Sequence, residues 1–251
     1  MIKSSVAERI ADIELARLDK KNAFTGEMYA ALAGALAAAD ADAKVRVVLL
    51  HGTNDCFSSG NDVNDFLKRP AGSDSPAIRL FDVLPGMKKP VVAAVGGPAI
   101  GIGSTLLLHC DIVYAAPNAR FQLPFVPLGI TPEFGSTYLL PLLAGYQRAA
   151  ELLLLGQPFN AEKAKDVGMV SEIIPESELL LKAREAARAL AALPPESIRL
   201  TKQLMKKRYG TALAETIREE TKIFTERLSS PEAKEALSAF LEKRKPDFSR
   251  F

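Results

Sequence analysis

Residues 91–116 of the sequence are VVAAVGGPAIGIGSTLLLHCDIVYAA, in which a glycine-rich turn joins two apolar runs. The spacing predicts a buried strand over residues 91–95 and a buried helix over residues 104–110. A membrane span is the alternative, because residues 90–110 carry no charged side chain. The glycines in this run argue against it, since their backbone groups would lack hydrogen bonds in lipid. We therefore predict a strand–turn–helix unit and, from the order of elements along the chain, an α/β fold.

A second strand-to-helix corner lies upstream at CFSSGNDV, residues 56–63. It follows the apolar run of residues 45–52 and leads into residues 61–68, whose spacing is helical. Gly60 can adopt backbone angles that other residues resist, and a turn that opens a helix leaves N–H groups unpaired. Two such corners could hold an anion or an oxygen that gains negative charge. An ordinary tight turn explains either corner taken alone.

The composition is that of an ordinary globular chain. The 251 residues are 48% hydrophobic, which is enough to bury one sizeable core or two modest ones. A net charge of +2 argues against a nucleic acid or a membrane surface as the main partner. Residues 1–15 scatter their charges and contain no apolar core of signal-peptide length, so we expect a cytoplasmic protein.

The cysteines and histidines predict neither a disulfide framework nor a metal site. Two cysteines, Cys56 and Cys110, are too few for a disulfide-stabilised fold. Together with His51 and His109 they lack metal-ligand spacing. The glycine turn does not match a nucleotide site either, because Leu106 stands where a dinucleotide fingerprint needs its third glycine and no lysine follows for a phosphate loop.

The rest of the chain alternates strand-like and helical patterns before becoming helical. Residues 9–19 alternate as a strand does, and residues 23–40 predict a helix that Thr25 can cap. Residues 134–156 predict two further helices. From Pro175 onward the pattern is almost wholly helical, which marks a C-terminal helical region.

Three motifs in this order resemble the crotonase (enoyl-CoA hydratase/isomerase) superfamily, and the resemblance spans nearly the whole chain. They are CFSSGNDV at 56–63, the stretch from KPVVAAV to PEFGS at 89–136, and FLEKRKPDF at 240–248. The resemblance implies a spiral of strand–strand–helix (ββα) turns over residues 1–195, which contains the acyl-CoA site. It implies a helical trimerisation region over residues 196–251, in homo-trimers that are often stacked as hexamers. The substrate would be an acyl-CoA thioester, with no cofactor beyond the coenzyme A that the substrate carries.

By resemblance, the two corners form an oxyanion hole from the backbone N–H groups of Asn61 and Ile102. Ile102 replaces the glycine usual in the hydratases, but only its N–H is needed. The glutamates that hydratases use correspond here to Thr105 and Phe125, neither of which can act as a base. Glu133 stands where the Δ3,Δ2-enoyl-CoA isomerases of the family carry their single base, although an acid at this position could instead serve the first turn of a helix.

The resemblance also assigns the residues that bind the substrate and its CoA. Lys20, Lys21 and Ala23 match the segment that receives the adenine end, and Phe240 and Lys243 match positions that reach the CoA of a neighbouring subunit. A solvated turn and an amphipathic helix are the respective structural alternatives. The remaining expected contacts are Ser59, Gly60, Asn61, Asp62, Val63, Phe66, Gly101, Ile102, Pro124, Phe125 and Pro132. Asp62 is expected to begin a helix rather than to act as a base.

Three functions remain open from the sequence. Isomerisation of a 3-enoyl-CoA is the leading hypothesis, because one carboxylate can remove the C2 proton and return it to C4 without water. Hydration of a 2-enoyl-CoA is the second. A protein that binds acyl-CoA without catalysis is the third, since lost catalytic acids can leave binding intact.

Overall fold

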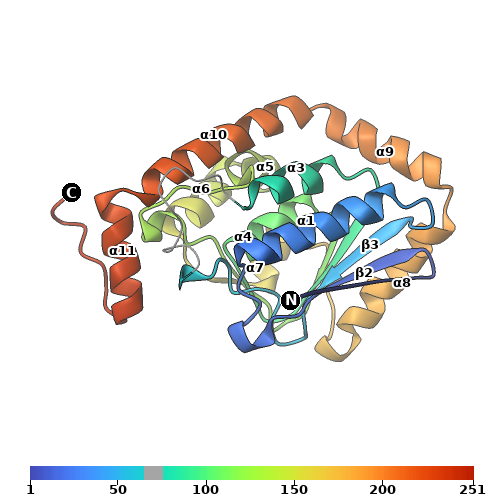
Figure 1. Cartoon of the computed structure of the whole chain (residues 1–251), viewed down its shortest axis with the longest axis horizontal. Coiled ribbons are helices and arrows are strands. Elements are labelled where there is room, and N and C mark those ends of the chain that lie inside the picture. Colours follow the sequence, from blue (N-terminus) through green and yellow to red (C-terminus); the bar gives the residue numbers. More distant parts are fainter. Residues whose placement is uncertain (65–75) are drawn as a thin grey trace.

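Two strands, β3 (Val47–His51) and β4 (Val91–Val95), pair in parallel at the centre of the main sheet. Every residue of both strands is buried, which explains why the sequence shows continuous apolar runs rather than alternation. The computed structural model describes residues 1–64 and 76–251 (Figure 1). In this part of the chain the main sheet has the order β1-β2-β3-β4-β6-β9, with β1 antiparallel to β2 and all other pairs parallel.

The other described elements come before and after these two strands in the chain. The remaining strands are β1 (Ile2–Ala7), β2 (Ile10–Leu15), β5 (Pro98–Ile100), β6 (Ile112–Ala115), β7 (Arg120–Gln122), β8 (Phe159–Asn160) and β9 (Glu172–Ile173). The helices before the C-terminal region are α1 (Gly26–Ala41), α3 (Ile78–Gly86), α4 (Ile102–Thr105), α5 (Ser136–Ala144), α6 (Tyr146–Leu155), α7 (Ala161–Asp166) and α8 (Leu179–Ala192). Short 3-10 turns are η1 (Leu18–Lys20), η2 (Leu106–His109), η3 (Val126–Leu128) and η4 (Glu176–Glu178).

The main sheet is covered on both faces. Val47 and Leu49 of β3 pack in the cluster that contains the buried side of α8. The alternate residues, Val48 and Leu50, face the larger core that contains α1 and α3. Side chains of successive strand residues point to opposite faces, so one uncharged strand supplies both cores.

A second sheet, ordered β5-β7-β8, positions the glycine turn beside the first corner. A Cβ on Gly97, whose φ is 61°, would lie 1.9 Å from Asp55 O, and a Cβ on Gly96 would lie 2.2 Å from Asn54 O. Both glycines are therefore required by the close approach of the backbone that opens the first corner.

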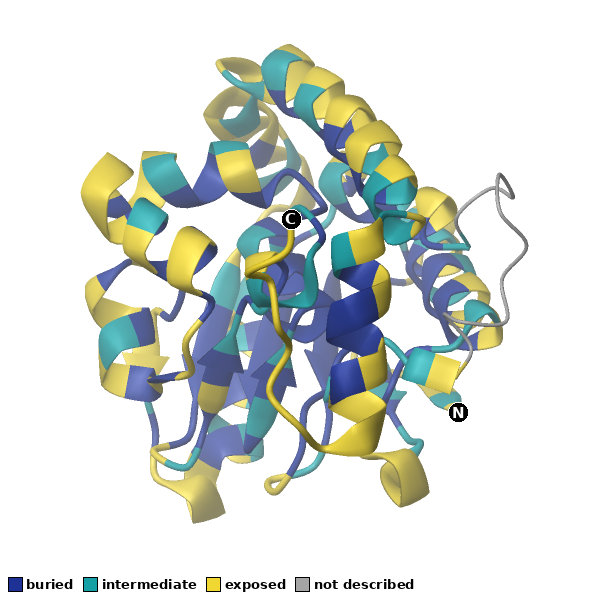
Figure 2. Cartoon of the chain, turned by 90° about the vertical axis from the view of Figure 1, so that its left-hand side faces the viewer, coloured by how far each residue is buried: buried dark blue, intermediate teal, exposed yellow. Residues whose placement is uncertain are grey.

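The C-terminal helices are α9 (Pro195–Lys207), α10 (Gly210–Leu228) and α11 (Pro231–Glu242). Figure 1 shows α9 and α10 along the upper side of the molecule and α11 at its left end. Helix α9 buries only Lys202, whose Nζ bonds to Asp111 Oδ2 at 2.6 Å and to Lys89 O at 2.8 Å. Much of the outer surface of these helices is exposed (Figure 2). Exposed apolar side chains in this region include Leu200, Leu204, Met205, Phe240 and Leu241.

The structure confirms the predicted α/β class, the strand at residues 91–95 and the helical C-terminal region. The predicted helix at 104–110 forms as α4 followed by η2, and Thr25 Oγ1 accepts a hydrogen bond from Met28 N at the start of α1. Strand β1, which pairs with β2 as a hairpin, was not predicted from the sequence. Within the described parts of the chain, every helix is too short or too polar to span a bilayer.

Candidate active site

The two corners lie side by side in the structure. Ser58 of the first corner pairs in parallel with Ala99 at the second. Ser58 N donates to Pro98 O at 2.8 Å, and Ile100 N donates to Ser58 O at 2.9 Å. A Cβ on Gly60, whose φ is 95°, would lie 3.1 Å from Ile100 O. Glycine at residue 60 therefore suits both the backbone angle and the close contact between the corners.

Asn61 and Ile102 each present a backbone N–H group that makes no hydrogen bond within residues 1–64 and 76–251. Gly60 O and Asp62 N bond to Phe24, at 2.8 and 2.9 Å. Because backbone groups alternate in direction along an extended segment, the N–H of Asn61 points away from Phe24. Ile102 is the first residue of α4, and the first N–H groups of a helix have no partner within it. Both residues thus have the donor that an oxyanion hole requires.

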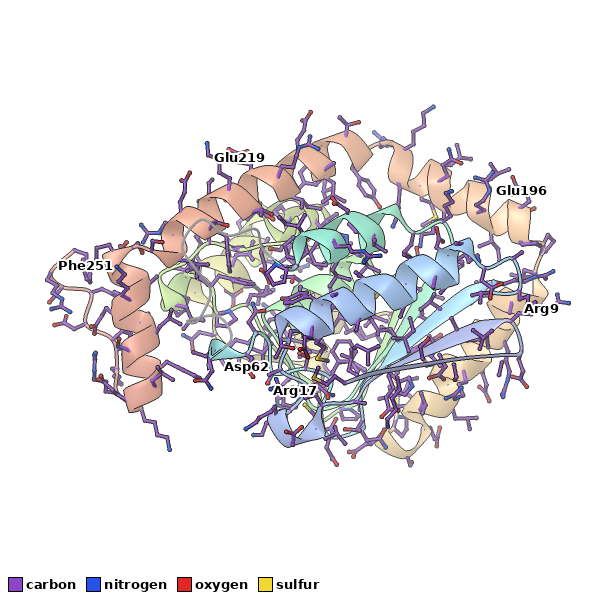
Figure 3. All side chains as sticks on the ribbon, in the orientation of Figure 1. Arg9, Arg17, Asp62, Glu196, Glu219 and Phe251 are labelled. Atoms are coloured by element: carbon purple, nitrogen blue, oxygen red, sulfur yellow. The ribbon has the colours of Figure 1, made fainter. Side chains whose placement is uncertain are left out.

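Polar side chains fix the end of the first corner. Arg17 Nη1 lies 2.8 Å from Asp62 Oδ2, and Figure 3 labels both residues. Asp62 Oδ1 also accepts a hydrogen bond from Asn64 N at 3.1 Å, as expected for a residue that begins a helix. Tyr29 Oη donates to Asn61 Oδ1 at 2.6 Å. The carboxylate of Asp62 therefore serves the backbone and Arg17, while the amide of Asn61 is held by α1.

The side chain of Asn22 links residues 20–23 to the first corner through hydrogen bonds. Its side chain is fully buried, and Nδ2 donates to Cys56 O at 3.2 Å and to Phe57 O at 3.0 Å. Ser59 N in turn donates to Lys21 O at 2.9 Å. Asn22 has a φ of 53°, in the left-handed region that asparagine tolerates better than most residues. The residues expected to receive the adenine end are thereby placed next to those expected to bind the thioester.

Glu133 lies in the loop between η3 and α5, and its side chain is buried, with 4% of the residue exposed. The next two residues, Phe134 and Gly135, have φ values of 61° and 71°. Phe81 of α3 stacks on Phe134 with ring centroids 4.2 Å apart. A left-handed backbone at a phenylalanine is uncommon, so packing and hydrogen bonds around this loop must hold it in place.

His109 supports the Glu133 loop from the helical segment that Ile102 begins. Its Nε2 lies 2.8 Å from Phe134 O, so this nitrogen carries the hydrogen and donates it to the carbonyl. Complete burial lowers the pKa of His109 to about 3, and His109 is therefore neutral at physiological pH. One end of the segment 102–109 thus leaves the N–H of Ile102 without a hydrogen bond in the described residues, and the other end holds the loop of Glu133.

Acid should destabilise the fold through His109. The unfolded side chain binds a proton below a pKa of 6.5, whereas the folded side chain does so only near 3. The unfolded state therefore binds more protons in this interval, and stability falls as the pH is lowered, by up to about 1.4 kcal/mol per pH unit for this group. His109→Gln keeps an N–H donor and should flatten this dependence between pH 6.5 and about 3.

Urea unfolding of both proteins at several pH values measures the effect. The carboxyl groups that titrate in the same interval are common to both chains and cancel in the comparison. His51 is also common to both: burial lowers its pKa, but bonds to Asp12 and to Gly52 O outweigh burial and raise it. His51 therefore stabilises the fold below 6.5 and loses this effect as the pH rises through its folded pKa, which is the opposite sign. Equal slopes for the parent and His109→Gln would exclude a buried neutral His109.

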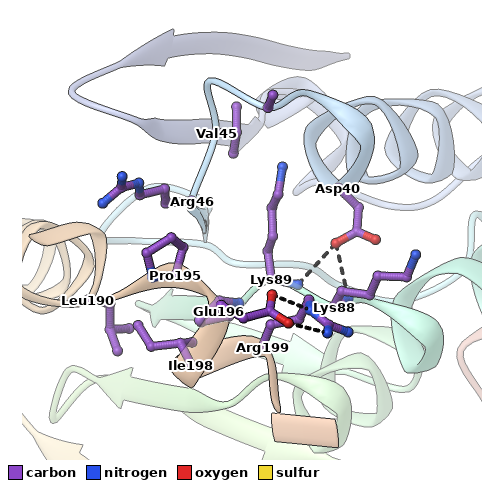
Figure 4. A pocket seen from close by; sticks show the side chains of 12 residues that line it. Asp40, Val45, Arg46, Lys88, Lys89, Leu190, Pro195, Glu196, Ile198 and Arg199 are labelled. Carbon is purple, nitrogen blue, oxygen red and sulfur yellow. Dashed lines mark hydrogen bonds and ion pairs between the residues drawn. The ribbon is translucent and has the colours of Figure 1, made fainter. Parts of the chain in front are cut away.

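The pocket in Figure 4 is separate from the two corners. It has a volume of about 310 Å³ and lies between the end of α1, residues 88–90 and the start of α9. Asp40 Oδ1 accepts bonds from the backbone N–H groups of Lys88 and Lys89, and Arg199 pairs with Glu196. Asp40 therefore links the end of α1 to residues 88–89, whereas the Arg199–Glu196 pair lies within α9. Across residues 1–64 and 76–251, no group of three or more His, Cys, Asp or Glu side chains could hold a metal ion.

Comparison with known proteins identifies the family. A sequence model described as enoyl-CoA hydratase/isomerase matches residues 5–250. The chain belongs to this family. Membership in the enoyl-CoA hydratase/isomerase family confirms the resemblance noted from the three motifs, and it implies substrates that are acyl-CoA thioesters.

Individual members of the enoyl-CoA hydratase/isomerase family agree with this assignment. The chain is 36% identical over 265 residues to 1,2-epoxyphenylacetyl-CoA isomerase of Escherichia coli (strain K12), covering 99% of this chain and 98% of that protein. It is 37% identical to enoyl-CoA delta isomerase 2 of Rattus norvegicus, covering 94% of this chain and 62% of the rat protein. The crystal structure of enoyl-CoA hydratase/isomerase from Pseudoalteromonas atlantica T6c superposes with a TM-score of 0.94 at 37% identity, covering 98% of this chain and 99% of that one. This similarity confirms the predicted crotonase fold.

The structure brings one group of the expected site residues together at the two corners. Lys20 and Lys21 are exposed beside the first corner, whereas Ala23 is buried. Gly101 N donates to Gln122 O, which places the second corner next to the strand that leads to Pro124 and Phe125. The other expected contacts at the corners, Ser59, Gly60, Asp62 and Val63, are contiguous with Asn61, and Pro132 directly precedes Glu133.

Of the other expected residues, two belong to α11 and its C-terminal end, and one is not among the described residues. Phe66 lies outside the described residues. Phe240 is 59% exposed on α11, which packs against η3, and Lys243 is the left-handed residue that ends α11. Their contact with the CoA of a neighbouring subunit stays a prediction.

Several residues that shape the site were not found from the sequence. Asn22, Tyr29 and Arg17 act through contacts with the first corner, and His109 acts through the loop of Glu133. Asn22 stands between two lysines and an apolar pair in the sequence. This position was one weak signal for its role, because a buried asparagine often bonds to backbone groups. The other three have no local pattern that predicts their partners.

Proposed function

We propose that the chain is a Δ3,Δ2-enoyl-CoA isomerase with Glu133 as its single base. Glu133 takes a proton from C2 of a 3-enoyl-CoA, and the negative charge moves to the thioester oxygen. The N–H groups of Asn61 and Ile102 stabilise that oxygen. The protonated Glu133 then delivers the proton to C4, so the double bond moves from C3 to C2 and no water is consumed.

The observation that carries this proposal is the identity of the two residues where hydratases of this family have glutamates. They are Thr105 and Phe125, and both are buried. The other buried acids of the described chain, Glu220 and Glu235, accept hydrogen bonds from the start of α5 and from two arginines respectively. Glu133 is then the buried carboxylate in the loop supported by His109, and a single base suffices for isomerisation.

The same proposal includes the CoA contacts and the assembly. Lys20, Lys21 and Ala23 receive the adenine end of the CoA, and Phe240 and Lys243 reach the CoA of a neighbour in a homo-trimer or hexamer. Exposed apolar side chains on the C-terminal helices, such as Leu204 and Met205, support burial against another subunit.

Turnover of 3-enoyl-CoA and of 2-enoyl-CoA, measured side by side on the purified protein, tests the proposal. We expect isomerisation of the 3-enoyl-CoA to exceed hydration of the 2-enoyl-CoA. Faster hydration would favour a hydratase that uses an acid other than Glu133. Tight acyl-CoA binding with no turnover of either compound would identify a binding protein.

A further inference from the structure

Glu220 of α10 is a buried acid that the proposed reaction does not use. Its carboxylate accepts three hydrogen bonds from the start of α5: from Gly135 N to Oε2 at 2.5 Å, and from Thr137 N and Oγ1 to Oε1 at 2.9 and 2.5 Å. Only 6% of Glu220 is exposed. Burial raises the pKa of Glu220, while these hydrogen bonds oppose that shift. The C-terminal region thus bonds directly to the backbone that follows Glu133.

These bonds replace a cap that α5 lacks in its own sequence. The residue before the helix is Gly135, so no side chain can accept from the first N–H groups. Glu220 provides the acceptor from another helix, and its negative charge is favourable at a helix N-terminus. Without Glu220, the N–H groups of Gly135 and Thr137 would lose their hydrogen-bond acceptor at the end of a partly buried helix.

The same bonds fix an unusual turn. Phe134 and Gly135 are both left-handed, and this conformation costs roughly 1–2 kcal/mol for a residue other than glycine. Leu213 and Ile217, also from α10, close on Gly135: a Cβ there would lie 2.4 Å from Leu213 Cδ1 and 3.2 Å from Ile217 Cγ1. With His109 bonded to Phe134 O on one side and α10 on the other, the backbone after Glu133 is held from two directions.

We propose that Glu220 is a positioning residue that sets the direction from which Glu133 reaches the substrate. The inference rests on the proposed role of Glu133 as the base. Glu220 touches no reacting atom; it acts by holding Gly135 and Thr137, and through them the turn that begins at Glu133. A small misplacement of a catalytic group can lower a rate by as much as about 10²-fold, so a residue with this role affects turnover more than binding.

Glu220→Gln tests the proposal, because glutamine keeps only one acceptor oxygen, and its amide nitrogen cannot accept the remaining N–H, from either Gly135 or Thr137. We expect kcat for 3-enoyl-CoA to fall by about 10- to 100-fold with KM little changed. Glu219→Gln is the matched control: it makes the same chemical change one residue away on the exposed side of α10, where Figure 3 labels Glu219, and kcat should stay at the parent value. Parent-like kcat in a folded Glu220→Gln protein would overturn the proposal.

A double-mutant cycle separates positioning from a general structural effect. If Glu220 acts through Glu133, then Glu220→Gln should not lower kcat further in a Glu133→Gln background. Additive losses would overturn the proposal, whereas failure of Glu133→Gln itself to lower kcat would count against the proposed base instead. Should Glu220→Gln not fold, Thr137→Val removes only the hydroxyl donor to Oε1 and should lower kcat in the same direction by a smaller factor. Parent-like kcat in that variant would then contradict the proposal.

Discussion

Replacing Glu133 with glutamine should lower kcat for isomerisation of 3-enoyl-CoA by at least about 10²-fold. Glutamine keeps the shape of the side chain and much of its hydrogen bonding, but it cannot accept the C2 proton. General acid–base catalysis contributes roughly 10²- to 10⁴-fold, and in the proposed mechanism one carboxylate performs both proton transfers. Steady-state kinetics with a 3-enoyl-CoA substrate measure the change.

Binding distinguishes loss of the base from loss of the fold. The N–H groups of the corners and the CoA contacts come from other segments, so Glu133→Gln should bind a non-reactive acyl-CoA about as tightly as the parent does. Calorimetry of acyl-CoA binding and a thermal melt supply this control. Isomerisation that stays within about 10²-fold of the parent in a folded variant would exclude Glu133 as the base.

Replacing Ile102 with proline should remove one of the two donors of the proposed oxyanion hole. Loss of such a donor costs about 2.7–4 kcal/mol of transition-state stabilisation, which corresponds to roughly 10²- to 10³-fold in kcat. Proline is tolerated at the first position of a helix, and Ile102 occupies that position in α4. The backbone can therefore keep its path while the N–H is lost.

Ile102→Ala is the matched control, because it removes side-chain packing and keeps the N–H. Ile102 is fully buried, so alanine should lower the free energy of unfolding by about 2–5 kcal/mol while kcat stays near that of the parent. Measured kcat and urea midpoints for both variants separate the two effects. Equal kcat values for the proline and alanine variants would show that the N–H of Ile102 does not stabilise the enolate.

Much of the fold follows from local patterns. The uncharged runs at β3 and β4 predicted central strands, and the change to helical spacing after Pro175 predicted the C-terminal helices. The strand β1 was missed because five of its six residues are exposed and its apolar positions do not alternate clearly. Strands β8 and β9 have two residues each, which is too short for any periodicity to appear.

The residues of the candidate site could likewise be predicted only where they are close together in the sequence. Corner residues such as Gly60 and Ile102 could be predicted because a strand, a turn and a helix follow one another in the sequence. Contacts between distant segments could not: Tyr29 reaches Asn61 across 32 residues, and Glu220 reaches Gly135 across 85. Nothing in the residues around Glu220 distinguishes it from the exposed acids of the same helix except its place on the buried side.

The cap that α10 provides for α5 also bears on how the protein is made. On the ribosome, Gly135 emerges 85 residues before Glu220, so α5 is synthesised without the acceptor that its first N–H groups use in the finished protein. Lys202, which bonds to Lys89 O, is likewise made 113 residues after its partner. Strands β3 and β4 are both synthesised before α5, but the turn after Glu133 reaches its final form only when α10 has left the ribosome. The loop of Glu133 is therefore completed only after all the strands of the main sheet have been synthesised.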